Sequence, residues 1–168
     1  DPKRNLDIIR KAIFGLMYGD IIVQTANQVR PYEVQAGQTE QTIEAVQNHL
    51  LEEMSKGKGL SFKSMVENFD HIVAAFKAIP VAGEPKVRVG VVGEIYIKYS
   101  PLGNNNLEQF LLSEGAEPVV PGLTDFIIFK IYNREVDVDI YGGKWAKKTA
   151  CAALRHYVEK CQRAMIGA

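Results

Sequence analysis

A run of polar side chains follows an apolar stretch near the middle of the chain. Between Gly93 and Asn106 stand a carboxylate, an ammonium group, two phenols, a hydroxyl and three consecutive amides, supplied by Glu94, Tyr96, Lys98, Tyr99, Ser100, Asn104, Asn105 and Asn106. A carboxylate accepts hydrogen bonds or acts as a base, an ammonium group binds phosphate, and a tyrosine ring stacks on a flat ligand. We expect these residues to contact a substrate or cofactor. They match no catalytic set, so no catalytic residue is predicted.

The position of this run in the chain favours the same conclusion. In an open α/β sheet, ligands bind beyond the carboxyl ends of the strands. Loops from strand to helix are usually about two to six residues long, and the segment Gly93–Asn106 exceeds that length. An alternative stays open, because polar and apolar residues alternate from Ile95 to Tyr99. The strand would then run on to Tyr99, Ser100–Gly103 would form a turn, and the asparagines would only cap a helix.

Three stretches before residue 80 have apolar residues at helical spacing. The first, 5–29, predicts one helix, or two that are broken near Gly19-Asp20, and the proline at position 31 ends it. The second predicts a helix over 39–55 that is capped by Thr39, and the third a helix that is capped by Ser61 and ends before Pro80. We therefore expect residues 1–80 to form a helical segment.

The pattern changes after the linker at 81–85, where two β-rich runs flank a helical one. The predicted order is a strand over Val87–Val92, a helix over Leu107–Glu114 with Asn106 as its cap, and a strand over Glu117–Val120. This order defines a βαβ unit, whose strands are parallel and whose crossover is right-handed. The first strand is apolar except for Arg88, which is typical of a strand covered on both faces.

Two more helices are predicted, over Thr124–Glu135 and Lys144–Met165. Two strands do not make a stable parallel sheet alone. Either the strictly alternating run Val136–Tyr141 supplies another strand, or strands come from outside this chain. The expected fold class is therefore helix-rich α/β, with a βαβ unit of a doubly wound parallel sheet, as an incomplete piece of a larger protein. Residues 86–168 form the α/β segment and pack with residues 1–80 as one compact unit.

Composition and charge exclude several classes of partner. The chain has 168 residues, with 20 basic residues balanced by 20 acidic ones, so no overall field attracts nucleic acid or an anionic membrane. No apolar run approaches the roughly eighteen residues of a transmembrane helix, and no signal peptide is visible. The start Asp-Pro-Lys favours an excised piece of a longer protein, and we expect a cytoplasmic location.

Cysteine and histidine spacing predicts no metal site. Cys151 and Cys161 stand ten positions apart on one predicted helix. That separation is about 15 Å along the axis, too far for a disulfide. His49, His71 and His156 fall on three predicted helices without paired ligand spacing, and we expect each to be solvated or satisfied on its own.

The polar segment also carries a resemblance to a known family. The stretch V-G-V-V-G-E-I-Y-I-K-Y-S-P-L-G-N-N-N-L-E (Val89–Glu108), followed by F-L-L-S-E-G-A-E-P-V-V-P-G-L (Phe110–Leu123), resembles the 2-hydroxyglutaryl-CoA dehydratase component family. It is most similar to the large proteins known as CoA-substrate-specific enzyme activases. Arg30-Pro31-Tyr32-Glu33 adds to the likeness, which covers most of residues 10–130.

The resemblance implies a lyase system of anaerobic metabolism. In that family a 2-hydroxyacyl-CoA loses water by a radical route, with ATP hydrolysis driving the electron and a [4Fe–4S] cluster carrying it. Family subunits place a cysteine ligand shortly after the strand that matches Glu117–Val120, whereas this chain has Pro121–Asp125 there, without cysteine. We therefore expect no cofactor in this chain, which lacks a phosphate loop as well, and no activity of the fragment alone.

Three hypotheses on function follow. The first is a domain of a dehydratase/activase-like protein that helps to bind acyl-CoA or a cofactor, with the remaining domains of the same chain and a dehydratase or activator protein as partners. The second is a non-catalytic module that docks an electron-transfer partner. An exposed apolar face on the helix over 5–29 would favour it. The third is a stand-alone α/β domain that binds a small molecule.

Overall fold

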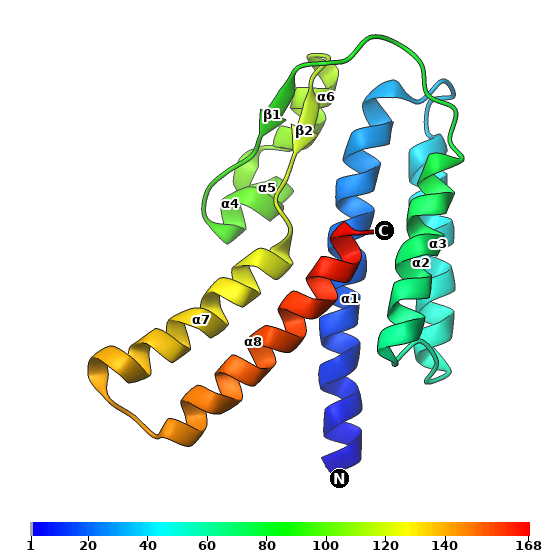
Figure 1. Ribbon diagram of the computed structural model, residues 1–168. Helices are drawn as coiled ribbons and strands as arrows, with labels where there is room; N and C mark the ends of the chain where they lie inside the picture. The colour runs from blue at the N-terminus through cyan, green and yellow to red at the C-terminus, as the bar shows by residue number, and fades with distance from the viewer. Residues whose placement is uncertain (1) are drawn as a thin grey trace.

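Helices make up most of the chain, and two short parallel strands lie among them (Figure 1). The computed structural model describes residues 2–168, with side chains from Asp7 onward. The elements in chain order are α1 (Pro2–Val29), the 3₁₀ turn η1 (Arg30–Tyr32), α2 (Gln38–Ser55), α3 (Phe62–Lys77), β1 (Arg88–Gly90), α4 (Ile95–Tyr99), α5 (Pro101–Asn104), α6 (Leu107–Ser113), β2 (Glu117–Val119), α7 (Leu123–Tyr141) and α8 (Trp145–Ile166). None of these helices is long and apolar enough to cross a membrane.

The hydrophobic core lies where α1 meets α2, α3 and α8. Figure 1 shows α1 between the α2–α3 pair and the α7–α8 pair. Its core residues share helical spacing on one face and are fully or almost fully buried: Phe14, Met17, Tyr18, Ile21 and Ile22. The ring of Tyr18 meets the ring of Phe69 edge to face at 5.6 Å between centroids, and its hydroxyl accepts a hydrogen bond from the Asn68 amide at 3.0 Å. The three helices expected before residue 80 are present, and α1 continues through Gly19-Asp20 without the break that was one of the two options.

Two predicted helix caps have different outcomes. Ser61 caps α3 as expected, because its hydroxyl accepts from the Ser64 amide, and Ser64 reciprocates in a capping box. Thr39 is not the cap of α2, since the helix begins at Gln38 and Thr39 is buried within its first turn. The carboxylate of Glu33 takes the capping role, accepting from the amides of Gly37 and Thr39, each at 2.7 Å. Burial raises the pKa of Glu33, but these hydrogen bonds and the nearby Arg30 outweigh it and leave that pKa below its usual value.

The βαβ unit is present. Strand β1 pairs with β2 in parallel, with Arg88 opposite Glu117 and Gly90 opposite Val119, and three short helices fill the crossover. The expectation that the first strand is covered on both faces is wrong for this chain. Val87 and Val92, which flank β1, are 75% and 80% exposed, and within β1 Arg88 and Gly90 are exposed while Val89 is only half-buried.

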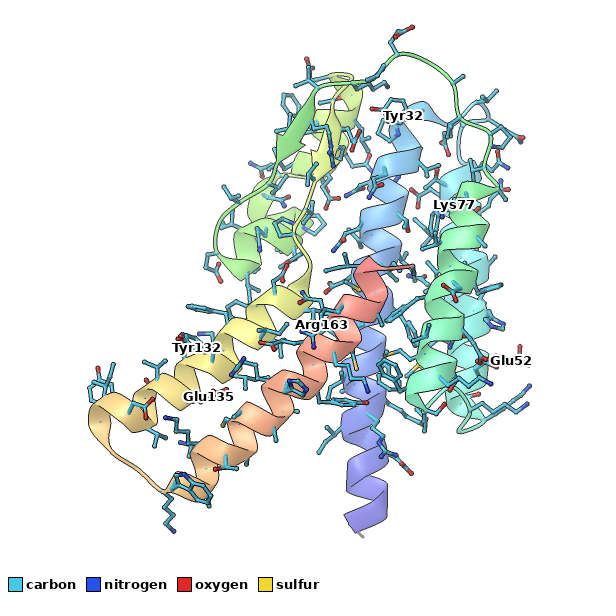
Figure 2. All side chains as sticks on the ribbon, viewed as in Figure 1. Tyr32, Glu52, Lys77, Tyr132, Glu135 and Arg163 are labelled. Carbon is cyan, nitrogen blue, oxygen red and sulfur yellow. The ribbon has the colours of Figure 1, made fainter. Side chains whose placement is uncertain are left out.

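The alternating run Val136–Tyr141 is helical, so the option that it forms a strand is wrong. Helix α7 continues from Leu123 through Tyr141 and packs along α8 as a hairpin. Figure 2 places Glu135 between the two helices, where its carboxylate pairs with the Arg155 guanidinium at 2.8 Å. The α7–α8 packing outweighs the two-residue period, since a strand here would have no neighbouring strand to bond.

Candidate functional site

The polar segment 93–106 is neither a long loop nor a continued strand. It folds into the short helices α4 and α5, which are separated by Ser100. The carboxylate of Glu94 accepts from the amide of Tyr96 at 3.0 Å and caps α4, and the Ser100 hydroxyl accepts from the Gly103 amide and caps α5. The side-chain oxygens of both predicted site residues therefore cap helix starts, because each helix start leaves amides without internal partners.

The three asparagines form the corner between α5 and α6. Asn104 donates from its amide nitrogen to the Ile97 carbonyl at 3.0 Å and accepts from the Leu107 amide at 3.2 Å. Asn105 and Asn106 both adopt the left-handed conformation, with φ of 54° and 56°, which asparagine tolerates better than most residues. Asn106 occupies the cap position of α6 as predicted, but its side chain makes no capping bond, and Asn104 supplies that bond instead.

Tyr96 and Lys98 lie on the outer side of the segment. Tyr96 is 52% exposed, and its ring covers Gly103 so closely that a Cβ there would stand 2.8 Å from a ring carbon. The Lys98 ammonium group lies 4.9 Å from the centre of the Tyr99 ring, a cation–π distance. Lys98 makes no ion pair with a described residue, so its charge can meet an anion.

Tyr99 ties the segment to the start of α7. Its hydroxyl donates a hydrogen bond to the carbonyl of Pro121. Burial raises the pKa of Tyr99 to about 12, and the negative charges of Asp20 and Asp125 add to that shift. Tyr99 is therefore a neutral hydrogen-bond donor at pH 7 and does not act as a base.

This pKa predicts alkaline sensitivity at one residue. The pKa of Tyr99 is raised above its unfolded value of about 10, so its contribution to stability is complete below about pH 10 and is lost as the pH rises toward 12. We expect Tyr99→Phe to flatten the fall of unfolding free energy between about pH 10 and 12, measured by urea denaturation. The pKa values of Tyr18 and Tyr157 are also raised, so these two residues still contribute to the loss of unfolding free energy at alkaline pH in the variant. An unchanged slope in Tyr99→Phe would contradict the prediction.

A surface hollow brings part of the polar segment together with the end of α1. It has a volume of about 280 Å³, and we call it the Arg30 hollow. Its lining residues are Arg30, Glu40, Tyr99, Pro101, Asn104, Asn106, Glu108, Gln109 and Leu112. Three predicted site residues thus share one hollow, whereas Glu94, Tyr96, Lys98, Ser100 and Asn105 are not among its lining residues.

Charge in the Arg30 hollow is mixed. The Arg30 guanidinium pairs with the Glu40 carboxylate at 2.7 Å and donates to the Asn27 side chain at 2.8 Å. Asn27 in turn donates to the Glu108 carboxylate at 2.8 Å. One cation is therefore already engaged and is accompanied by two carboxylates, so the hollow suits a neutral hydrogen-bonding group better than a phosphate.

A second hollow of about 250 Å³ lies at the carboxyl end of β2, between that strand and α1. Gln24, Asn27 and Asp125 line it, together with residues 118–122. Near it, Tyr32 extends from the end of α1, where Figure 2 shows it, and donates from its hydroxyl to the Glu117 carboxylate at 2.9 Å. The stretch Arg30–Glu33 therefore contributes to the Arg30 hollow, to β2 and to the start of α2.

Sequence reasoning did not include Arg30 and Glu108 among the site residues. Arg30 stands 69 positions before Tyr99 in the sequence, and no spacing rule connects them. The only available signal was that the stretch Arg30–Glu33 shares the family resemblance with the polar segment.

The two cysteines lie on α8, unpaired, with Cys161 buried and Cys151 partly exposed, which agrees with the prediction that they form no disulfide. Among the described residues, no group of three or more His, Cys, Asp or Glu side chains is placed to hold a metal ion.

No family model, no curated protein and no solved structure matches this chain. What the chain does must therefore be argued from its own geometry.

Proposed function

We propose that this chain is a domain of a 2-hydroxyacyl-CoA dehydratase/activase-like protein and that the Arg30 hollow binds part of the acyl-CoA. The observation that supports the proposal is the meeting of Arg30 with Tyr99, Asn104 and Asn106 in one hollow. Both stretches carry the resemblance to that family, and they are distant in sequence.

The size and charge of the hollow define which part of the ligand it takes. Pockets for whole small molecules have volumes of about 300–1,000 Å³, so a hollow of 280 Å³ holds only a portion of an acyl-CoA. The carboxylates of Glu40 and Glu108 repel phosphates, whereas the Asn106 amide and the Tyr99 region offer hydrogen bonds to a neutral group. We assign the pantetheine amides or the 2-hydroxyacyl end to the hollow, and the phosphates to the ammonium group of Lys98 outside it.

We assign the redox and ATP-dependent steps to other components of the enzyme system. A [4Fe–4S] cluster and ATP would be bound by other domains of the same protein or by a dehydratase or activator partner, in the cytoplasm. The free edge of β1 supports a place within a larger, doubly wound sheet, since parallel sheets are normally buried. The lyase activity belongs to that assembly.

Binding can be tested by anaerobic calorimetric titration of the chain with CoA and with a short 2-hydroxyacyl-CoA. We expect Lys98→Ala to weaken both ligands, and Asn106→Gly to weaken the acyl-CoA by about three- to tenfold, the usual range for one lost hydrogen bond. Asn105→Gly is the matched control, because Asn105 has the same backbone conformation and does not line the hollow. Equal effects of the two glycine variants, or no saturable binding at about 1 mM, would contradict the proposal.

A second candidate, the docking module, is favoured by the surface of α1. Ile8, Ile9 and Val23 are exposed apolar residues of α1, at 56%, 53% and 41%. A groove of about 360 Å³ between α1 and α2 is lined mainly by apolar residues, including Ile22, Leu51 and Met54. An absence of acyl-CoA binding would favour this candidate.

A further inference from the structure

Two imidazole rings meet across the pair α2–α3. His49 lies on α2 and His71 on α3, and their ring centroids are 4.8 Å apart with the ring planes tilted by 43°. The two helices are joined by a short turn and lie side by side (Figure 1). Histidine spacing in the sequence gave no sign of this pair, because 22 positions separate the two residues.

The ring pair opens onto solvent with room on one side. Both histidines are exposed and line a hollow of about 490 Å³. Ala45 stands one turn before His49 and Ala75 one turn after His71, and these small side chains leave the hollow open. Gln38, Gln41 and Thr42 border it further along.

The ring separation fits binding of one ion by both imidazoles. A histidine nitrogen binds first-row divalent ions at about 2.0–2.1 Å, which places the ion about 3.2 Å from each ring centre. Two such rings have centroids about 4.5 Å apart when the bonds meet at a right angle and about 5.2 Å apart at a tetrahedral angle. The observed 4.8 Å lies between these values.

Carboxylates near the pair do not complete the site. Glu52, one turn after His49, pairs with Lys56, and Glu67, one turn before His71, pairs with Lys63. Within the described residues, no third ligand side chain joins the two histidines.

We propose that His49 and His71 form a binding site for a divalent first-row transition ion, with two imidazole ligands and water in the other positions. Imidazole suits copper, nickel and zinc, whereas calcium and magnesium require oxygen ligands. Affinity follows the usual order, with Cu²⁺ above Ni²⁺ and Zn²⁺. A bound ion connects α2 to α3 and leaves open positions that a third group can fill.

The test is calorimetric titration of the tag-free chain with CuCl₂, NiCl₂ and ZnCl₂. We expect saturable binding of one ion per chain, at least tenfold weaker in His49→Ala and in His71→Ala. His156→Ala is the matched control, since His156 is an exposed histidine on α8, and it retains full affinity. Circular dichroism verifies that each variant is folded.

A spectroscopic readout makes the inference falsifiable as well. The Cu²⁺ complex has an electron paramagnetic resonance spectrum with nitrogen couplings from two imidazoles, reduced to one in either single variant. Comparable affinity for Ca²⁺, an unchanged affinity in His49→Ala, or no saturation up to about 1 mM Cu²⁺ would overturn the proposal.

Discussion

Asp20→Ala is expected to lower the free energy of unfolding by about 3 kcal/mol, because it removes the cap of α7. Asp20 lies in the middle of α1 and is 7% exposed. Its carboxylate accepts hydrogen bonds from the amides of Leu123 and Thr124 at 2.8 Å and 2.7 Å. Without the carboxylate, both amides at the start of α7 lose a charged acceptor in a place that water reaches poorly.

The position of Gly122 shows how closely the two segments meet. A Cβ at Gly122 would stand 2.7 Å from the Asp20 carboxylate oxygen, so a side chain at this position would displace that carboxylate. Chemical denaturation of Asp20→Ala measures the loss, and Asp20→Asn recovers part of it because one oxygen remains as an acceptor. Asp70→Ala is the matched control, since Asp70 is exposed on α3, and its effect stays within about 0.5 kcal/mol. Equal stability of Asp20→Ala and Asp70→Ala would refute the capping role.

Phe69→Ala is expected to lower the free energy of unfolding by about 4 kcal/mol, more than any other substitution proposed for this chain. Phe69 is fully buried and packs edge to face on Tyr18, in the part of the core that joins α1 to α3. Removal of the ring leaves a cavity, and the surrounding structure relaxes only in part to fill it. The partner Tyr18 also keeps its hydrogen bond to Asn68, which holds the tyrosine in place beside the cavity.

The measurement for Phe69→Ala is again urea denaturation, with Phe110→Ala as the matched control. Phe110 lies on α6 and is 57% exposed, so its removal costs much less. A loss below about 1 kcal/mol for Phe69→Ala would show that the contact between α1 and α3 contributes little to the core.

Local signals in the sequence were sufficient for much of the fold. The apolar stripe of α3 and its Ser61 cap are set by neighbours within one or two turns, so the sequence determined both the helix and its start. The parallel pairing of β1 and β2 also followed from the chain order, because a strand–helix–strand unit returns in the same direction.

Local signals failed at one helix start and in one run of alternating residues. In α2 the capping role belongs to Glu33 rather than Thr39, because η1 turns the chain so that the Glu33 carboxylate accepts from the amides of Gly37 and Thr39. The run Val136–Tyr141 has the period of a strand, but α8 supplies a packing partner for a helix and no strand lies beside it.

In the candidate sites, too, some neighbours follow from the sequence and others only from the tertiary structure. The sequence by itself determined that Tyr99, Asn104 and Asn106 are close to one another, since few residues separate them. Only the tertiary structure decided that Arg30 joins them and that His49 meets His71. The physical reason is that helices hold residues at fixed intervals along one element, whereas packing of the hydrophobic core decides which faces of different elements come together.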